Sequence, residues 1–460
     1  MHESVSRRKF LAGTLSAGAG AAVFTGTERA DAIDAAFNSN FKPSEQSFMD
    51  QYFDGIMKIV RGIRDTQLET IVKAMEKAYE LKKKGGNIYS HVVHGHYAMF
   101  GGSRDLPGQP WVLPQSGITP PQAEFDAMKK GDFLLTHRVC ENTKKVRERG
   151  VFVAGMTNNY FQFSRTPADF LREDRVKLTI EEISDLLIDS HVPYDNGLVH
   201  APQLPQVACC PSSGISAFSV YWSCTAALAA LIGTKGKGSA IDTARKYLDT
   251  LIERFEMVGT DRPKVDWIAE KWADLVLGSR ARMLLYGHPQ QVEPYLGTRN
   301  MFVNDSYICS SSAMIADQYE TKAAELRKDD IVLVSAFTSN HPLEIEAARF
   351  ARSRGAYTVA FCPYATEGDS SGLRLFKETD DAINTYADER AGVVAVPGFT
   401  EKVCPISTMT GDLVLWLLTA QWADYMARRG EMPYFWKGYH ENGGSEFDNL
   451  AEAIYKKRGY

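Results

Sequence analysis

Residues 329–335 read DDIVLVS, and this stretch decides the fold. Two aspartates are followed by a short apolar run of β-branched residues and leucine, which is typical of a buried parallel strand. A helical pattern follows and ends at residues 352–355 (RSRG), and a second apolar strand follows at residues 357–361. Strand, helix and strand in this order predict a unit of a parallel α/β sheet.

The same motifs occur in the same order earlier in the chain. Residues 131–136 (GDFLLT) lead into a helix that ends at residues 147–150 (RERG), and a strand follows at residues 151–155. Two more pairs match, namely the strand and Gly-His turn at 87–96 against 282–288, and the helix entries at 207–213 (VACCPSS) against 402–408 (KVCPIST). Matched positions lie about 200 residues apart in every pair, which indicates an internal duplication.

Helices are expected before each first strand. Apolar residues recur at helical spacing over residues 47–84, with a break near Arg64 and Asp65, and Gly85-Gly86 is a typical helix stop. A further helix is expected over residues 267–277. We therefore predict two three-layer αβα domains with doubly wound parallel sheets, at residues 45–235 and 236–460, packed as a pseudo-dimer within one chain.

The start of the chain predicts export. Residues 6–11 (SRRKFL) precede a short apolar segment and then Ala30-Asp31-Ala32, which is the pattern of a twin-arginine signal peptide. We expect cleavage near Ala32, a linker at residues 33–44 and a periplasmic or otherwise exported mature chain. Retention as an N-terminal anchor is the alternative. No later segment is expected to span a bilayer, so no stable membrane insertion is predicted after cleavage.

Composition narrows the class of protein further. The net charge is −5, and no lysine- or arginine-rich run occurs, which disfavours nucleic acid as a partner. The seven cysteines form no Cys-x-x-Cys pair, which favours buried thiols, although an exported protein permits a disulfide.

The matched motifs resemble the SIS (sugar isomerase) domain family, in particular its phosphosugar-binding branch. The resembling segments are residues 85–86 with 95–96, 185–195, 287–288, 335–340, 354–355, 405–408 and 443–449. The resemblance implies paired sugar-binding domains, a small carbohydrate derivative as ligand and no cofactor. Homo-oligomerisation is left open.

The resemblance and the chemistry of strand-to-helix loops name the candidate site. Such loops present hydroxyls and free N–H groups at the positive end of a helix. The expected ligand-binding residues are Gly95, Gly287, Ser335, Thr338, Ser339, Asn340, Ser407 and Thr408. Isomerisation needs a base and a group that opens the sugar ring, and the catalytic candidates are His440, Glu441, Glu346, His288 and His96.

The two loops after the matched strands differ. Phe337-Thr338 stand where the family has small residues, and the loop at residues 136–141 is shorter. Together with export, this favours a neutral or acidic carbohydrate over a phosphorylated one. The second copy is the better candidate site, and the first copy is expected to act mainly as its structural partner.

A histidine cluster supplies an alternative chemistry. His91, His94 and His96 follow one another at a strand end, and three imidazoles can bind zinc or another divalent metal. We favour a site without metal. Three functions remain open at this point: an aldose-ketose isomerase, a non-catalytic carbohydrate-binding protein, and a metal-dependent enzyme built on the histidine cluster.

Overall fold

The computed structural model describes residues 43–92, 112–113, 121–158, 164, 166–167, 170, 178–202, 208–287, 306–307, 326–364, 371–388, 392–433, 435, 442–443 and 458. The signal peptide and most of the linker expected before residue 45 lie outside these residues. We refer to residues 45–235 as the first half and to residues 236–460 as the second half.

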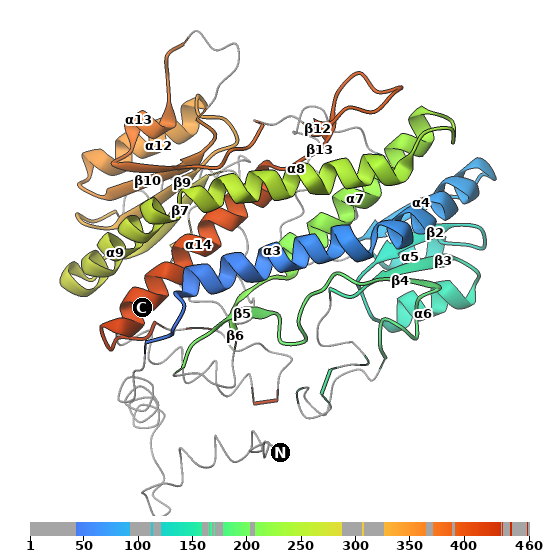
Figure 1. Ribbon diagram of the computed structural model, residues 1–460, viewed down its shortest axis with the longest axis horizontal. Helices are drawn as coiled ribbons and strands as arrows, with labels where there is room; N and C mark the ends of the chain where they lie inside the picture. Colours follow the sequence, from blue (N-terminus) through green and yellow to red (C-terminus); the bar gives the residue numbers. More distant parts are fainter. Residues whose placement is uncertain are drawn as a thin grey trace, which may run out of the picture.

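Each half contains one parallel sheet, and the two sheets have matching strand orders (Figure 1). The first sheet is ordered β1-β2-β3-β4, from β1 (Ile88–His91), β2 (Phe133–Thr136), β3 (Phe152–Met156) and β4 (Leu186–Ile188). The second is ordered β8-β7-β9-β10-β11, from β7 (Met283–Gly287), β8 (Ser306–Tyr307), β9 (Ile331–Ser335), β10 (Tyr357–Cys362) and β11 (Asp381–Asn384). Every neighbouring pair in both sheets is parallel.

Helices cover both faces of each sheet, as the alternation of side chains along the strands requires. In β2, Phe133 and Leu135 face the main core, whereas Leu134 faces α5 and α6. In β9, Leu333 faces the main core and Val332 faces α12. Two three-layer α/β arrangements result, as predicted from the sequence.

The helices and their bounds follow the chain in two similar series. The first half has α3 (Phe48–Thr66), α4 (Leu68–Lys83), α5 (Gln122–Ala127), α6 (Glu141–Glu148) and α7 (Ser213–Gly233). The second half has α8 (Ala240–Thr260), α9 (Arg262–Ser279), α12 (Pro342–Ser353), α13 (Leu375–Glu378) and α14 (Ser407–Arg428).

The first helix of each series begins at a serine cap. Ser47 accepts a hydrogen bond from the N–H of Asp50, and Ser239 accepts one from the N–H of Asp242. The chain turns from α3 to α4 at Gln67, two residues after the expected break. The predicted stop after α4 is confirmed, since Gly85 has a φ of 89°.

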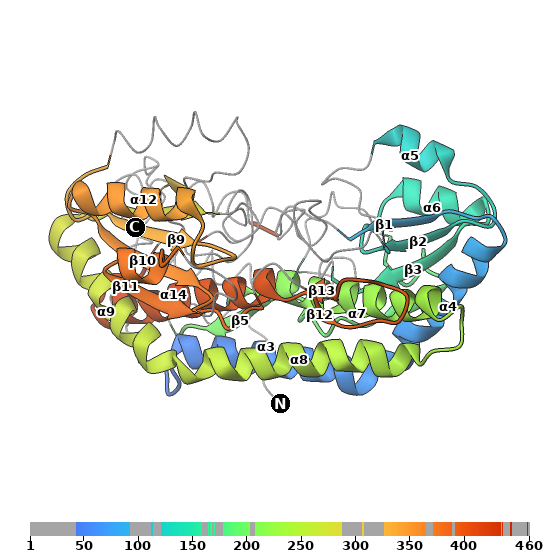
Figure 2. The same ribbon diagram turned by 90° about the horizontal axis from the view of Figure 1, so that it is seen from above.

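The first helices of the two halves are exchanged. Helix α3 packs most extensively on α14 of the second half, and α8 packs most extensively on α7 of the first half. Figure 2 shows α3 and α8 running side by side beneath both sheets, with the sheets at the two ends of the molecule. One continuous apolar core therefore joins the halves.

A short antiparallel pair precedes the most apolar helix in each half. Strands β5 (Gly197–His200) and β6 (Ala208–Pro211) precede α7, and β12 (Gly392–Val394) and β13 (Val403–Pro405) precede α14.

The expectation that no later segment could span a bilayer is wrong for one helix. By length and composition alone, α7 is apolar enough to cross a membrane. Its apolar window is 94% buried within the fold, as in the core helix of many globular proteins.

The cysteine prediction is confirmed within the described residues. Cys209, Cys210, Cys224, Cys362 and Cys404 are buried and free, and Cys140 is free and partly exposed.

Candidate functional site at the carboxyl ends of the strands

The loop after β9 contains most of the predicted ligand-binding residues. Ser335 is the last residue of β9, and it pairs in register with Gly287 at the end of β7. The structure therefore brings these two predicted residues together at the carboxyl edge of the second sheet. In open α/β sheets this edge is where ligands bind.

Ser335 has an unusual environment for a hydroxyl. Its side chain is fully buried, and its Oγ has no hydrogen-bond partner in the structure. A buried hydroxyl left without a partner costs about 1–3 kcal/mol. A ligand hydroxyl or a bound water at this edge would remove that cost.

The rest of the loop lies between β9 and α12. Thr338 and Asn340 are partly exposed, and Ser339 is buried with its carbonyl accepting a hydrogen bond of 2.5 Å from the N–H of Leu375. Phe337 is 2% exposed, so its ring packs inside the protein.

The other predicted residues are distributed over several places. Ser407 and Thr408 are buried at the start of α14. Glu346 is exposed on α12. The positions of His96, His288, His440, Glu441 and Gly95 lie outside the described residues.

A pair that the sequence analysis did not select lies in the same strand-to-helix connection. His341 precedes α12, and its Nδ1 contacts Oε2 of Glu344 in the first turn of the helix. The side chain of Glu344 is 5% exposed and that of His341 is 31% exposed. Glu344 was missed because its burial depends on how α12 packs, which a helical pattern alone does not resolve at the first turn.

The first sheet carries a second polar edge. Thr157, after β3, hydrogen-bonds Asp189 through Oγ1 at 2.8 Å and lies 3.2 Å from the hydroxyl of Ser190. Asn158 donates through Nδ2 to the carbonyl of Ser213, the first residue of α7, at 2.6 Å. The shorter loop of the first half is therefore accompanied by a buried polar network that the sequence analysis did not predict.

The metal alternative concerns His91, at the end of β1. Its Nε2 lies 2.6 Å from Oε1 of Glu124, and burial lowers the pKa of the imidazole despite the neighbouring carboxylate. His94 and His96 lie outside the described residues. Within the residues that can be described, no group of three or more His, Cys, Asp or Glu side chains is arranged to hold a metal ion.

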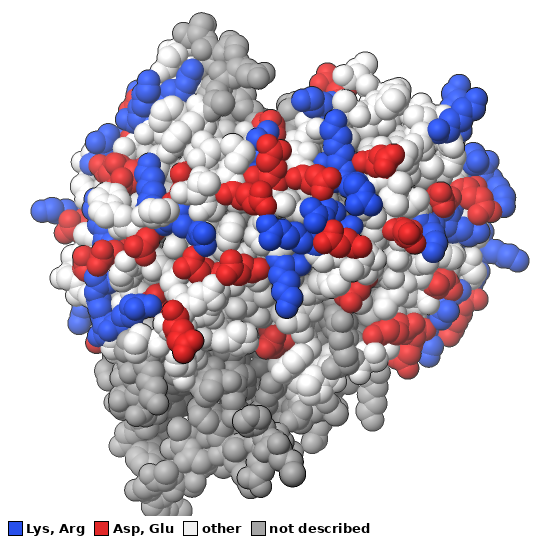
Figure 3. All heavy atoms as spheres, viewed as in Figure 1, with Lys and Arg blue, Asp and Glu red and all other residues white. Residues whose placement is uncertain are grey.

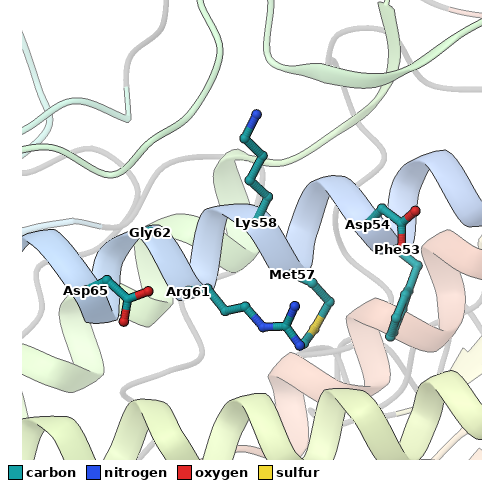
Figure 4. A pocket seen from close by; sticks show the side chains of 7 residues that line it. All are labelled: Phe53, Asp54, Met57, Lys58, Arg61, Gly62 and Asp65. Carbon is teal, nitrogen blue, oxygen red and sulfur yellow. The ribbon is translucent and has the colours of Figure 1, made fainter.

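A hollow of about 450 Å³ lies elsewhere, along α3 (Figure 4). Asp54, Lys58, Arg61 and Asp65 line it together with Phe53, Met57 and Gly62. Arg61 is already paired with Glu256 of α8 at 2.7 Å. Basic and acidic side chains are interspersed over the described part of this face of the molecule (Figure 3).

Comparisons with known proteins give distant likenesses. No family model matches the chain. A UPF0309 protein of Oceanobacillus iheyensis is 25% identical over 137 residues, covering 28% of this chain and 55% of that protein. A UPF0309 protein of Geobacillus kaustophilus is 29% identical over 140 residues, covering 29% and 55%. The chain thus spans about half the length of the curated relatives it matches.

Solved structures resemble the whole chain more broadly. The C-terminal domain of glucosamine-fructose-6-phosphate aminotransferase from Francisella tularensis covers 83% of this chain and 97% of its own length, at 10% identity and a TM-score of 0.42. Tagatose-6-phosphate ketose/aldose isomerase from Escherichia coli covers 86% and 97%, at 12% identity and a TM-score of 0.38. Likenesses at these values assign no activity to the chain.

Proposed function

We propose that the chain binds a carbohydrate derivative at the carboxyl edge of the second sheet and interconverts its aldose and ketose forms. The observation that carries this proposal is the buried, unpartnered Oγ of Ser335, beside Gly287 and at the start of a hydroxyl-containing loop. The hydroxyls and amide of Thr338 and Asn340 are partly exposed on the same loop. Such groups suit the alternating donors and acceptors of a sugar.

The ligand we favour is neutral or acidic rather than phosphorylated. Residues 335–342 contain hydroxyl, amide and imidazole groups but no lysine or arginine. Phosphate is usually held by such basic side chains or by a wide glycine-rich loop. Phe337 occupies part of this loop with a buried ring.

A thermal-shift screen tests the binding step. The purified chain is heated with D-glucose, D-glucosamine, D-glucuronate and D-glucose 6-phosphate. We expect a rise in Tm with a non-phosphorylated sugar that Ser335→Ala reduces, whereas His200→Gln, on the exposed end of β5, leaves it unchanged. A shift with the phosphorylated sugar alone contradicts the ligand class.

Deuterium incorporation tests the catalytic step. Isomerisation through an enediol exchanges a carbon-bound proton with solvent, so the bound sugar should gain deuterium in deuterated water. The variant His440→Ala tests that candidate directly. Binding without exchange or product supports the alternative of a non-catalytic carbohydrate-binding protein.

The proposed reaction needs no metal. Chelator treatment followed by metal analysis should therefore leave binding and turnover unchanged. A loss of activity that zinc restores supports the alternative built on His91, His94 and His96.

The proposed location is the periplasm or another compartment reached by the twin-arginine route. Fractionation of cells that produce the chain should find it outside the cytoplasm, without the first 32 residues. Replacing Arg7 and Arg8 by lysine should retain the precursor in the cytoplasm. Equal export of the two forms contradicts the proposal.

We also infer that the two halves descend from one duplicated unit. The matching strand orders and the matching left-handed residues Cys210 and Cys404, with φ of 60° and 62°, support this origin. The proposed boundary lies at Lys235-Gly236, between α7 and α8. Because α3 and α8 are exchanged, fragments cut there should fold only when produced together, and a fragment that folds alone contradicts this boundary.

A further inference from the structure

The contact between His341 and Glu344 has no evident role in starting the helix. His341 occupies the N-cap position of α12, where serine, threonine, aspartate and asparagine usually accept a hydrogen bond from the helix. Its side chain makes no such bond. The imidazole instead turns to the carboxylate of Glu344 and keeps about a third of its surface exposed.

Burial explains why Glu344 holds the imidazole in place. A buried carboxylate is costly unless a charged or hydrogen-bonding group pairs with it. Contact with Nδ1 fixes the orientation of the ring and leaves Nε2 as the nitrogen that can exchange a proton. A histidine held by a carboxylate in this way is a recurrent arrangement for a general base.

The first half lacks this pair at the matching place. There, Cys140 occupies the N-cap position of α6, and its Sγ lies 3.3 Å from Oγ1 of Thr143, three residues later. The imidazole and carboxylate are therefore confined to the half that contains Ser335 and the longer loop.

We infer that His341 is the base that transfers the proton in the proposed isomerisation and that Glu344 is its positioning residue. Nε2 of His341 takes the proton from the carbon beside the sugar carbonyl. The electron pair of that C–H bond forms the C=C bond of an enediol, and the carbonyl oxygen becomes a hydroxyl by accepting a proton from solvent. The imidazolium then returns its proton to the former carbonyl carbon while the neighbouring hydroxyl loses one to solvent. No oxidant or reductant is needed.

The inference rests on the proposed function and is tested by chemical rescue. Exchange in deuterated water is measured with the non-phosphorylated sugar that gives the largest thermal shift. We expect His341→Ala to lower the exchange rate by about 10²- to 10⁴-fold with the sugar still bound. Added imidazole should restore part of the rate in proportion to its concentration, because the side chain is partly exposed. A purely structural histidine would show no such rescue.

Two further variants separate the roles. Glu344→Gln should lower kcat with little change in KM, and Glu344→Asp should recover part of the loss. Cys140→Ala, at the matching cap in the first half, should leave the exchange rate unchanged. His341→Gln serves as a second removal of the base if His341→Ala does not fold.

The outcomes distinguish the two proposals. If the wild-type chain exchanges no proton with any sugar tested, the proposed isomerase fails and this inference fails with it. If the wild type is active and both His341 variants keep its rate, only the assignment of His341 is overturned.

Discussion

Asp132 and Asp330 make the same two backbone hydrogen bonds in the two halves of the chain. Asp132 accepts the N–H groups of Asn87 at 2.8 Å and Lys129 at 2.9 Å. Asp330 accepts those of Arg282 at 3.1 Å and Arg327 at 2.9 Å. Each buried carboxylate thereby ties the start of one strand to the turn before the next.

Removing either carboxylate should destabilise the chain. Each N–H left without an acceptor costs about 1–3 kcal/mol. Asp330→Ala should cost more than Asp132→Ala, because Asp330 also pairs with the Arg282 guanidinium at 2.6 Å. Urea unfolding measures both. Asp126→Ala, which removes an exposed carboxylate of α5, should stay within about 0.5 kcal/mol of the wild type. Equal losses for all three variants contradict the prediction.

Acid should destabilise the fold through His91. Burial lowers the pKa of this imidazole below its ordinary value of 6.5. The unfolded chain therefore binds the proton more readily, so the stability contributed by neutral His91 is full above pH 6.5 and is lost as the pH falls through the lower folded pKa. Unfolding curves at about pH 7.5 and pH 5.5 should show a smaller loss in His91→Gln than in the wild type. His200→Gln is the matched control, and its loss should equal that of the wild type.

Alkali should act through Asp412 in the opposite direction. This carboxyl group in α14 is fully buried, neither oxygen has a hydrogen-bond partner, and burial raises its pKa well above 3.8. Stability from the protonated form is full below pH 3.8 and is lost as the pH rises through the folded pKa. Asp412→Asn should therefore reduce the fall in stability between about pH 5 and pH 8. The same fall in Asp412→Asn and wild type counts against this assignment, and exposed Glu69→Gln supplies the control.

Two glycines should respond to alanine with opposite signs. A Cβ on Gly86 would lie 2.1 Å from the carbonyl oxygen of Gly131, so Gly86→Ala should destabilise the chain by about 1–3 kcal/mol. A Cβ on Gly278, exposed in α9, would meet nothing within 4 Å, so Gly278→Ala should stabilise it by up to about 1 kcal/mol. Thermal unfolding measures both, and shifts of the same sign refute the prediction.

Short-range patterns predicted much of the fold. The strand at residues 330–335 corresponds to β9 and that at 151–155 to β3, each within one residue at either end. The helix expected at 267–277 is longer, as α9 begins at Arg262. Its early residues include Pro263, which is favourable only in the first turn and therefore marks a start that apolar spacing alone did not locate.

The site was less predictable, because its contacts join residues that are distant or whose burial depends on packing. The register between Gly287 and Ser335 followed from adjacent parallel strands, so both residues were named in advance. The choice between Glu344 and Glu346 required knowledge of which side of α12 faces the sheet. The pairing of His91 with Glu124 spans 33 residues and depends on the placement of α5.

The exchange of α3 and α8 also orders events during biosynthesis. Helix α7 is as apolar as a membrane span, yet one of the helices that covers it, α8, ends only at Thr260. A ribosome must release the chain beyond that residue before α7 can be fully enclosed, and the covering of α3 by α14 requires release through Arg428. Folding of the N-terminal segment therefore cannot finish while it is being translated, and a nascent chain with exposed α7 is a natural client for chaperones.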